Sequence, residues 1–155
     1  MKVATNYIEA HIIRKSNDQI EFLLLKRASH QWFPNLWQMV SGKIKDGEKA
    51  YESALREIQE ETGLVPEKLW VVPNINSFYL FEDDVIHQVP VFLGLVDYNS
   101  LVKISSEHSE FKWVLADEAK KLLSWPGQRK SVEIIQECFD STVKSFLHLS
   151  EIKIK

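Results

Sequence analysis

Three carboxylates lie close together in the first half of the chain, and their spacing suits the binding of a metal ion. Glu57, Glu60 and Glu61 stand at positions i, i+3 and i+4, which share one face of an α-helix. Like charges at these spacings repel one another, at a cost of roughly 0.2–0.5 kcal/mol per pair. A divalent cation reverses the sign of that interaction, and Mg²⁺ prefers hard oxygen ligands. The spacing predicts a magnesium site, with a solvated acidic helix face as the alternative.

The segment that must position these carboxylates has the pattern of an amphipathic helix from about residue 48 to residue 61. Apolar residues recur at three- and four-residue steps and predict a buried stripe of Ala50, Ala54, Leu55 and Ile58. Asp46-Gly47 is a turn signal ahead of the segment. Gly63 stands where a left-handed residue would end the helix, and Pro66 prevents the helix from resuming.

Further residues stand at fixed distances from the carboxylates: Gly42, Glu48, Arg56 and Gly63, with Ile58 and Leu64 in two apolar positions. The stretch resembles the Nudix box, Gly-x5-Glu-x7-Arg-Glu-U-x-Glu-Glu-x-Gly-U, where U is a bulky apolar residue. Every position matches, and seven fixed positions match by chance with a probability of about 10⁻⁸ to 10⁻⁹. The resemblance implies a Mg²⁺-dependent hydrolase that cleaves a diphosphate linked to another group, with Mn²⁺ as an alternative ion.

The resemblance also implies roles for the residues of the box. Glu57, Glu60 and Glu61 would bind the metal and take part in catalysis, and the carbonyl of Gly42 would add a metal ligand. Arg56 would orient the carboxylates, because its fork can donate two hydrogen bonds to one carboxylate. Glu48 would help to hold the loop and the helix together.

A glutamate in a loop near the end of the domain serves many Nudix enzymes as a general base or as an extra metal ligand. Glu107 of Glu107-His108 and Glu110 of Glu110-Phe111 both match that position, and Glu107 is slightly favoured. The alternative for either residue is a surface carboxylate. The predicted reaction is attack on phosphorus by a water molecule whose proton passes to a glutamate. The number of metal ions and the phosphorus attacked stay open.

Substrate-binding residues are predicted from the chain that precedes the box. Lys26 and Arg27 end a predicted strand and would bind phosphates, while Trp37 and Gln38 would meet a planar base. The alternatives are a solvated strand end and a core tryptophan. Ser41 belongs to a Val-Ser-Gly run where many Nudix proteins have Pro-Gly-Gly. That departure resembles the branch containing dihydroneopterin triphosphate pyrophosphatase, which also hydrolyses dATP.

The predicted activity is cleavage of a phosphoanhydride bond in a nucleoside triphosphate (dATP-like) or a pteridine triphosphate. The products would be pyrophosphate and a monophosphate. One alternative is a Nudix hydrolase of dinucleoside polyphosphates or nucleotide sugars. An alternative of another class is a non-catalytic ligand-sensing module, but such modules often lose box carboxylates, and this chain retains all of them.

Length and composition fit one domain over residues 1–155 with a sizeable core. A net charge of −3 argues against a stable nucleic-acid partner, and the expected partner is a small polyphosphate. Cys138 is the single cysteine, which excludes an internal disulfide and fits a cytoplasmic protein. No apolar run is long enough to span a bilayer. A monomer and a homodimer are equally compatible with the sequence.

The remaining pattern predicts an α/β fold, and the Nudix resemblance implies an α/β/α sandwich with a mixed sheet. Predicted strands cover residues 4–15, 20–27, 37–40, 69–81, 85–97 and 110–115. The hairpin between the two long strands would turn near Asp83-Asp84. Helices are predicted over residues 116–123 and 128–148, the second with an apolar stripe of Val132, Ile135, Phe139, Val143 and Phe146.

Overall fold

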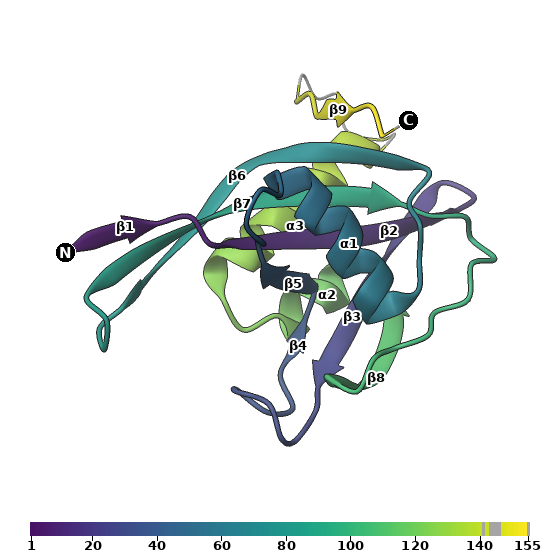
Figure 1. Ribbon diagram of the computed structural model, residues 1–155. Helices are drawn as coiled ribbons and strands as arrows, with labels where there is room; N and C mark the ends of the chain where they lie inside the picture. Colours follow the sequence, from purple (N-terminus) through teal and green to yellow (C-terminus); the bar gives the residue numbers. More distant parts are fainter. Residues whose placement is uncertain (141, 143–146, 155) are drawn as a thin grey trace.

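A computed structural model describes residues 1–140, 142 and 147–154 of the chain. Within this part, strands and helices follow one another as Figure 1 shows. Their bounds are β1 Lys2–Ala4, β2 Tyr7–Ser16, β3 Gln19–Arg27, β4 Trp37–Gln38, β5 Val40–Lys43, α1 Ala50–Thr62, β6 Lys68–Leu80, β7 Val85–Leu95, β8 His108–Val114, α2 Ala116–Leu122, α3 Pro126–Phe139 and β9 Ser150–Ile152.

The described strands form one mixed sheet with the order β4-β3-β2-β7-β6-β9. Strand β7 pairs in parallel with β1 and β2, whereas the other pairs are antiparallel. Strands β5 and β8 pair with β2 and β3, away from the main path. The predicted mixed sheet is confirmed.

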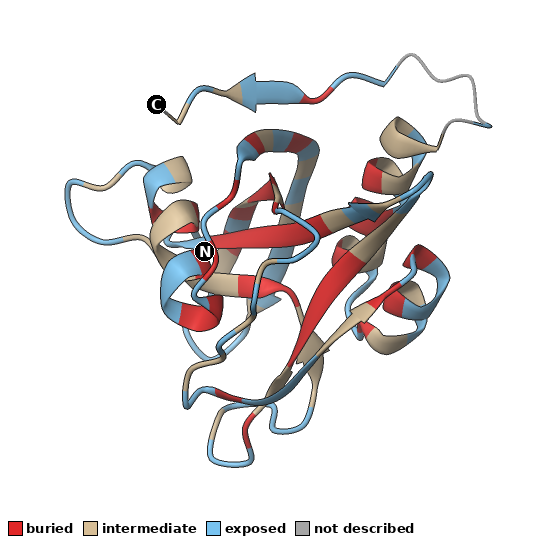
Figure 2. Cartoon of the chain, turned by 90° about the vertical axis from the view of Figure 1, so that its right-hand side faces the viewer, coloured by how far each residue is buried: buried red, intermediate tan, exposed pale blue. Residues whose placement is uncertain are grey.

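Helices cover both faces of the sheet, and a separate apolar cluster fills each face. Successive side chains of a strand point to opposite faces. In β3, Leu23 and Leu25 accordingly join the cluster under α1, while Phe22 and Leu24 join the cluster under α2 and α3. Buried residues line the sheet and the inner sides of the helices (Figure 2). The predicted α/β/α sandwich is confirmed.

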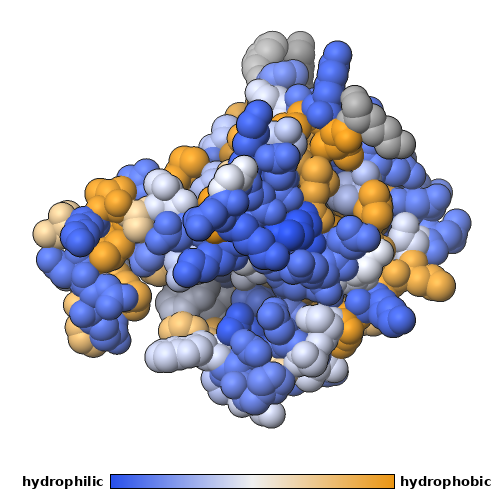
Figure 3. All heavy atoms as spheres, viewed as in Figure 1, coloured by the Kyte–Doolittle hydropathy of each residue, from blue (hydrophilic) through white to orange (hydrophobic). Residues whose placement is uncertain are grey.

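Helix α1 takes the place that the apolar stripe predicts. Ala54 and Ile58 are fully buried against the sheet, and Ala50 and Leu55 pack partly against the same cluster. Gly63 ends the helix with a φ of 72°, a left-handed conformation that glycine adopts at little cost. The opposite side of α1 is turned to solvent, and hydrophilic residues dominate that side of the surface (Figure 3).

Two neighbouring residues of β5 face opposite sides of the sheet. In the antiparallel register, Gly42 pairs with Ile8 and Ser41 pairs with Glu9. Ile8 belongs to the cluster under α1, and the Glu9 side chain is hydrogen-bonded to Gln128 of α3. This short strand therefore borders the α1 face and the α3 face at adjacent positions.

The N-terminal strand differs from its prediction. The single strand expected over residues 4–15 is divided at residues 5–6, and β1 pairs with the tip of β7 instead of continuing β2. Lys2 pairs with Val85, and the backbone N–H of Lys2 donates to Asp84 at 3.1 Å. Strand β1 and the β6–β7 hairpin together form an arm that extends from the body (Figure 1). The hairpin turn near residues 83–84 is confirmed.

The C-terminal helix is shorter than predicted. It ends at Phe139, and residues 140, 142 and 147–149 are not helical. The Asp140 carboxylate accepts hydrogen bonds from the Thr142 backbone N–H at 2.9 Å and the Thr142 hydroxyl at 2.7 Å. Such local bonds compete with helix continuation. Val143 and Phe146 of the predicted stripe lie outside the described residues.

Strand β9 was not predicted. It pairs with the outer strand β6, where Leu69 faces Ile152. Leu149, just before β9, is buried in the cluster under α3, which explains how the tail is held. Within residues 1–140, 142 and 147–154, the helices are too short or too polar to cross a membrane.

Candidate active site

Arg56 organises the polar face of α1. Its Nε and Nη2 donate to the two oxygens of Glu48 at 2.7 and 3.0 Å, which is a bidentate pair. Its Nη1 donates to Glu57 at 2.8 Å and to Glu60 at 3.1 Å. Nη2 also donates to the Lys43 carbonyl oxygen at 2.9 Å. One guanidinium thus links the loop, strand β5 and two of the predicted metal ligands.

The ion pair between Glu48 and Arg56 makes the stability of the fold depend on pH in the acid range. Hydrogen bonds from Arg56 lower the pKa of Glu48 from 4.5 to about 2. A carboxyl group whose folded-state pKa is lowered stabilises the fold above its unfolded pKa, and that stabilisation is lost as the pH falls. We therefore expect Glu48→Gln to lose stability relative to the parent at pH 7, with the difference shrinking between pH 4.5 and pH 2. Urea unfolding at several pH values measures it, and a pH-independent difference would contradict the assignment.

Glu57 occupies a space that only glycine leaves open. A Cβ atom added to Gly42 would lie 2.2 Å from Cδ of Glu57 and 2.4 Å from its Oε1. The carboxylate of Glu57 therefore rests directly on the backbone of β5. This contact brings the Glu57 carboxylate and the Gly42 backbone together, as the predicted metal site requires.

Glu61 is a buried carboxylate that lacks a counter-charge. The residue is 2% exposed, and neither carboxylate oxygen has a hydrogen-bond partner among the described residues. Burial is the main cause that raises its pKa from 4.5 to about 10, with further contributions from neighbouring Glu57 and Glu107. An unpaired buried carboxylate is costly unless a cation neutralises it. These properties of Glu61 fit a metal ligand.

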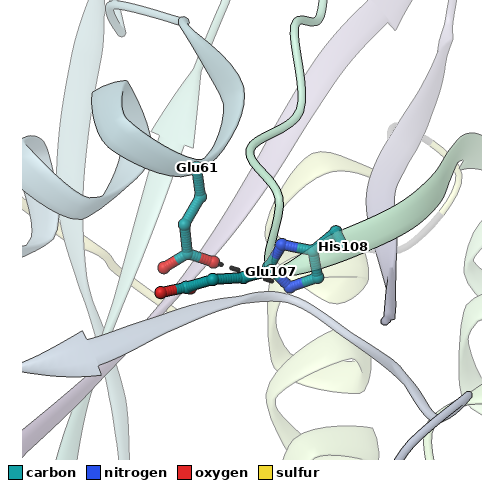
Figure 4. A group of neighbouring side chains, drawn as sticks. All are labelled: Glu61, Glu107 and His108. Atoms are coloured by element: carbon teal, nitrogen blue, oxygen red, sulfur yellow. Dashed lines mark ion pairs between the residues drawn. The ribbon is translucent and has the colours of Figure 1, made fainter. Parts of the chain in front are cut away.

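A second loop brings Glu107 and His108 to Glu61. Ligand atoms of these three residues lie within 4.8 Å of one another (Figure 4). The loop is held at the end of α1, because the backbone N–H of Lys103 donates to Thr62 at 2.8 Å and that of Ser105 donates to Glu61 at 3.3 Å. The carbonyl of Glu107 accepts from Ala28 of the β3 side at 2.9 Å. Residues distant in sequence thereby meet at one point.

His108 is a neutral member of this cluster and contacts Gln38. Burial, followed by the charge of Arg27, lowers its pKa to about 4. Its Nε2 lies 3.0 Å from Nε2 of Gln38 and 3.7 Å from Oε1 of Glu61. Because the ring is neutral near pH 7, it adds no positive charge to the carboxylates. A cation must come from elsewhere.

The described residues fit a divalent metal on two independent observations. Glu61 offers buried oxygens without partners, and Gly42 leaves room for the Glu57 carboxylate. Glu107 supplies a third carboxylate near Glu61. Glu60 lies further out, with a side chain that is 54% exposed and paired with Arg56. An all-oxygen set of this kind suits Mg²⁺ or Mn²⁺.

A cleft of about 490 Å³ opens beside the cluster. Four of the predicted substrate residues line it, namely Arg27, Trp37, Gln38 and Ser41, together with Gly42. The Arg27 guanidinium is held by the Trp32 carbonyl oxygen and lies 3.4 Å from Oε1 of Gln38. Trp32, Phe33 and Trp125 add aromatic surface to the same cleft, and Phe33 meets Trp125 edge to face at 5.7 Å.

Lys26 and Glu110 are not among the described residues that line this cleft or form the carboxylate cluster, although Nζ of Lys26 lies 6.0 Å from the ring of Trp37, which does line the cleft. They pair with each other across β3 and β8, with Nζ of Lys26 3.0 Å from Oε2 of Glu110. The Glu110 side chain is 58% exposed. Of the two glutamates considered as base, only Glu107 stands next to Glu61 in the described structure.

Sequence reasoning missed Glu9, Asn76 and Gln128, which meet on the α3 side of the cleft. Asn76 and Gln128 carry no signal of their own in the sequence. Glu9 does carry one, because it is a charged residue within an apolar strand pattern, Ile8 to Ile13. A buried carboxylate in such a strand needs partners from elsewhere in the fold.

Comparisons with known proteins agree with this geometry. A family model described as NUDIX domain matches residues 8–135. The mouse bis(5′-nucleosyl)-tetraphosphatase (asymmetrical) is 33% identical over 131 residues, which cover 79% of this chain and 84% of the mouse protein.

Two solved structures show the same fold. A C. elegans Ap4A hydrolase binary complex superposes with a TM-score of 0.72 at 23% identity, covering 86% of this chain and 96% of that one. The E. coli dihydroneopterin triphosphate pyrophosphohydrolase superposes with a TM-score of 0.69 at 22% identity, covering 84% and 92%.

Proposed function

Because the chain belongs to the Nudix family of hydrolases, which act on pyrophosphate bonds, we propose that it hydrolyses a nucleoside polyphosphate with the help of a divalent metal. One observation carries the proposal. The buried, unpartnered carboxylate of Glu61 lies beside Glu107, next to a cleft with aromatic walls. The carboxylate cluster, with its metal, would bind the phosphates, and the aromatic cleft would bind a flat base.

Each residue has a distinct task in the proposed reaction. Glu57 and Glu61 would hold Mg²⁺, which when bound acts as a Lewis acid toward the phosphate oxygens. Arg56 keeps the Glu57 carboxylate in place, and Arg27 is positioned to neutralise a phosphate from the cleft side. Glu107, which is exposed, accepts a proton from the attacking water. The water oxygen bonds to phosphorus, the anhydride P–O bond on the opposite side breaks, and the remaining part of the polyphosphate leaves as an anion that keeps the bridging oxygen.

Two substrate classes are favoured by different observations. Dinucleoside tetraphosphates are the first candidate, because the mouse relative that bears this activity in its name is 33% identical over most of both chains. Nucleoside triphosphates (dATP-like) and pteridine triphosphates are the second. The Val40-Ser41-Gly42 run and the Glu107-His108 pair favour this second class, because both resemble the pteridine branch of the family.

A substrate panel tests this proposal. Purified protein with Mg²⁺ is incubated with Ap4A, Gp4G, dATP, dGTP, dihydroneopterin triphosphate and ADP-ribose, and the products are separated by anion-exchange chromatography. We expect turnover of at least one polyphosphate, abolished by a chelator and restored by Mg²⁺ or Mn²⁺. A dinucleoside tetraphosphate would give a triphosphate and a monophosphate. Tight binding of one compound without cleavage of any would instead support the ligand-sensing module.

A further inference from the structure

Glu9 is a buried carboxylate that lies apart from the predicted metal site. It is 7% exposed and lies on β2, on the face that α3 covers. Its side chain lines the cleft described above and also a second cleft of about 480 Å³, which continues toward the N-terminal end of α3. Glu9 therefore stands where the two clefts meet.

Two amide groups hold this carboxylate in a fixed orientation. Nδ2 of Asn76 donates to Oε1 at 3.1 Å, and Nε2 of Gln128 donates to Oε2 at 2.9 Å. Asn76 is itself confined, because a Cβ atom on Gly127 would lie 1.9 Å from its Oδ1. Neighbouring Asn74 donates to the Gly127 carbonyl at 3.1 Å and to Ser131 at 2.8 Å. Strand β6 and helix α3 thus fix Glu9 from both sides.

The carboxylate retains unused accepting capacity on the cleft side. Its two oxygens offer about four lone-pair sites, and the amides of Asn76 and Gln128 use one on each oxygen. Burial raises the pKa of Glu9, whereas the two amide hydrogen bonds lower it. A buried carboxyl group with spare lone pairs favours a ligand that donates hydrogen bonds.

Three aromatic side chains that line the clefts beside this carboxylate are exposed to solvent. Phe33, Phe78 and Trp125 line both clefts and are 57%, 46% and 48% exposed. Phe78 is supported from behind by His87, on which it stacks at 4.9 Å with an interplanar angle of 22°. Exposed rings on a fixed support are suited to stack against a flat heterocycle.

We propose that Glu9 selects the base of the substrate by accepting two parallel hydrogen bonds from a ring N–H and the neighbouring exocyclic amine. Guanine presents this edge as its N1–H and 2-amine, and pterin presents it as its N3–H and 2-amine. Adenine presents a donor beside an acceptor, so one oxygen of Glu9 would meet a lone pair. The inference rests on the proposed function in one respect, since it takes the cleft to be the base end of a polyphosphate site. Among the substrate classes proposed above, it favours guanine nucleotides and pterins over dATP.

Binding of ligands that cannot be hydrolysed tests the inference separately from turnover. Calorimetric titration with Mg²⁺ present compares GMP, IMP and AMP, which lack an anhydride bond, and guanosine and neopterin, which lack phosphate. We expect GMP to bind about 10-fold or more tightly than IMP, which lacks the amine, and than AMP. Stronger binding of neopterin than of guanosine would identify pterin as the source. Equal binding of GMP, IMP and AMP would overturn the proposal, whether or not the protein hydrolyses any polyphosphate.

The variant Glu9→Gln distinguishes recognition from a structural role. An amide at this position pairs with a donor–acceptor edge, so we expect GMP affinity to fall about 10–100-fold while AMP affinity rises. Gln128 can present its oxygen to the new amide, which preserves folding. A uniform loss of all ligands would contradict the proposal.

Two further variants complete the test. Glu67→Gln removes an exposed carboxylate from the segment just before β6 and should leave the GMP to AMP ratio unchanged. Gly127→Ala displaces Asn76 without altering charge, so the preference for GMP over AMP should weaken. An unchanged ratio in Gly127→Ala would contradict the role given to Asn76.

Discussion

Glu61→Gln is expected to reduce kcat by a factor of 100 or more while leaving the metal-free fold intact. The reason lies in the environment of the carboxyl group. Burial raises the pKa of Glu61 far above its usual range, which favours the protonated form in the metal-free protein near pH 7, and glutamine has nearly the same shape and charge as that form. The substitution therefore costs little in the absence of metal, but it removes the anionic ligand when metal is present.

Thermal unfolding with and without Mg²⁺ measures both halves of this prediction. Mg²⁺ should raise the midpoint of the parent protein, because a ligand that binds only the folded state stabilises it. Glu61→Gln should have the parent's midpoint without metal and a much smaller rise with it. Glu67→Gln, which removes a carboxylate remote from the cluster, serves as the matched control. Near-normal turnover in Glu61→Gln would show that Glu61 is not an essential metal ligand.

Gly42→Ala is expected to have the second large effect, again without unfolding the domain. A single methyl group would collide with Cγ, Cδ and Oε1 of Glu57, all within 2.5 Å of the added carbon. The Glu57 side chain must then leave its position on β5 and its 2.8 Å contact with Arg56. We expect kcat to fall by about two orders of magnitude, as when a precisely oriented catalytic group is displaced.

Gly63→Ala provides the contrasting control for this variant. Gly63 has a φ of 72°, so alanine is strained there and should destabilise the fold by about 1 kcal/mol. Its added carbon would meet the Lys103 side chain at 3.5 Å and leaves the carboxylates untouched. Activity per folded molecule should therefore stay near normal in Gly63→Ala and collapse in Gly42→Ala. Equal activities would show that Glu57 needs no such space.

The sequence was most informative where spacing alone sets geometry. Three carboxylates at helical spacing must share a face, and the apolar stripe of Ala54 and Ile58 decides which face turns inward. The strands of the central sheet were recognisable for the same reason. Local periodicity, however, does not reveal which carboxylate is deprived of solvent. That Glu61 is buried and Glu60 exposed depends on the loop that packs against the end of α1.

The parts that sequence could not predict depend on contacts between distant segments. Lys26 was expected to bind phosphate, yet its cross-strand neighbour Glu110 pairs with it, and that register is invisible in one strand alone. The end of α3 at Phe139 depends on a local turn at Asp140 that the apolar periodicity conceals. The role proposed for Glu9 depends on its hydrogen bonds with Asn76 and Gln128, which lie 67 and 119 residues away in the sequence.

The opposed orientation of Ser41 and Gly42 in β5 has a consequence for how such a protein can change over evolutionary time. On the proposal that the α3 face recognises the base, substitutions at alternate positions would alter base choice without displacing the carboxylates, because successive side chains of a strand point to opposite faces of the sheet. A deletion or insertion of one residue in Val40–Lys43 would exchange the two sides at once and disable both. New substrate preferences must therefore arise here by replacement of side chains, while the length of this segment stays constant.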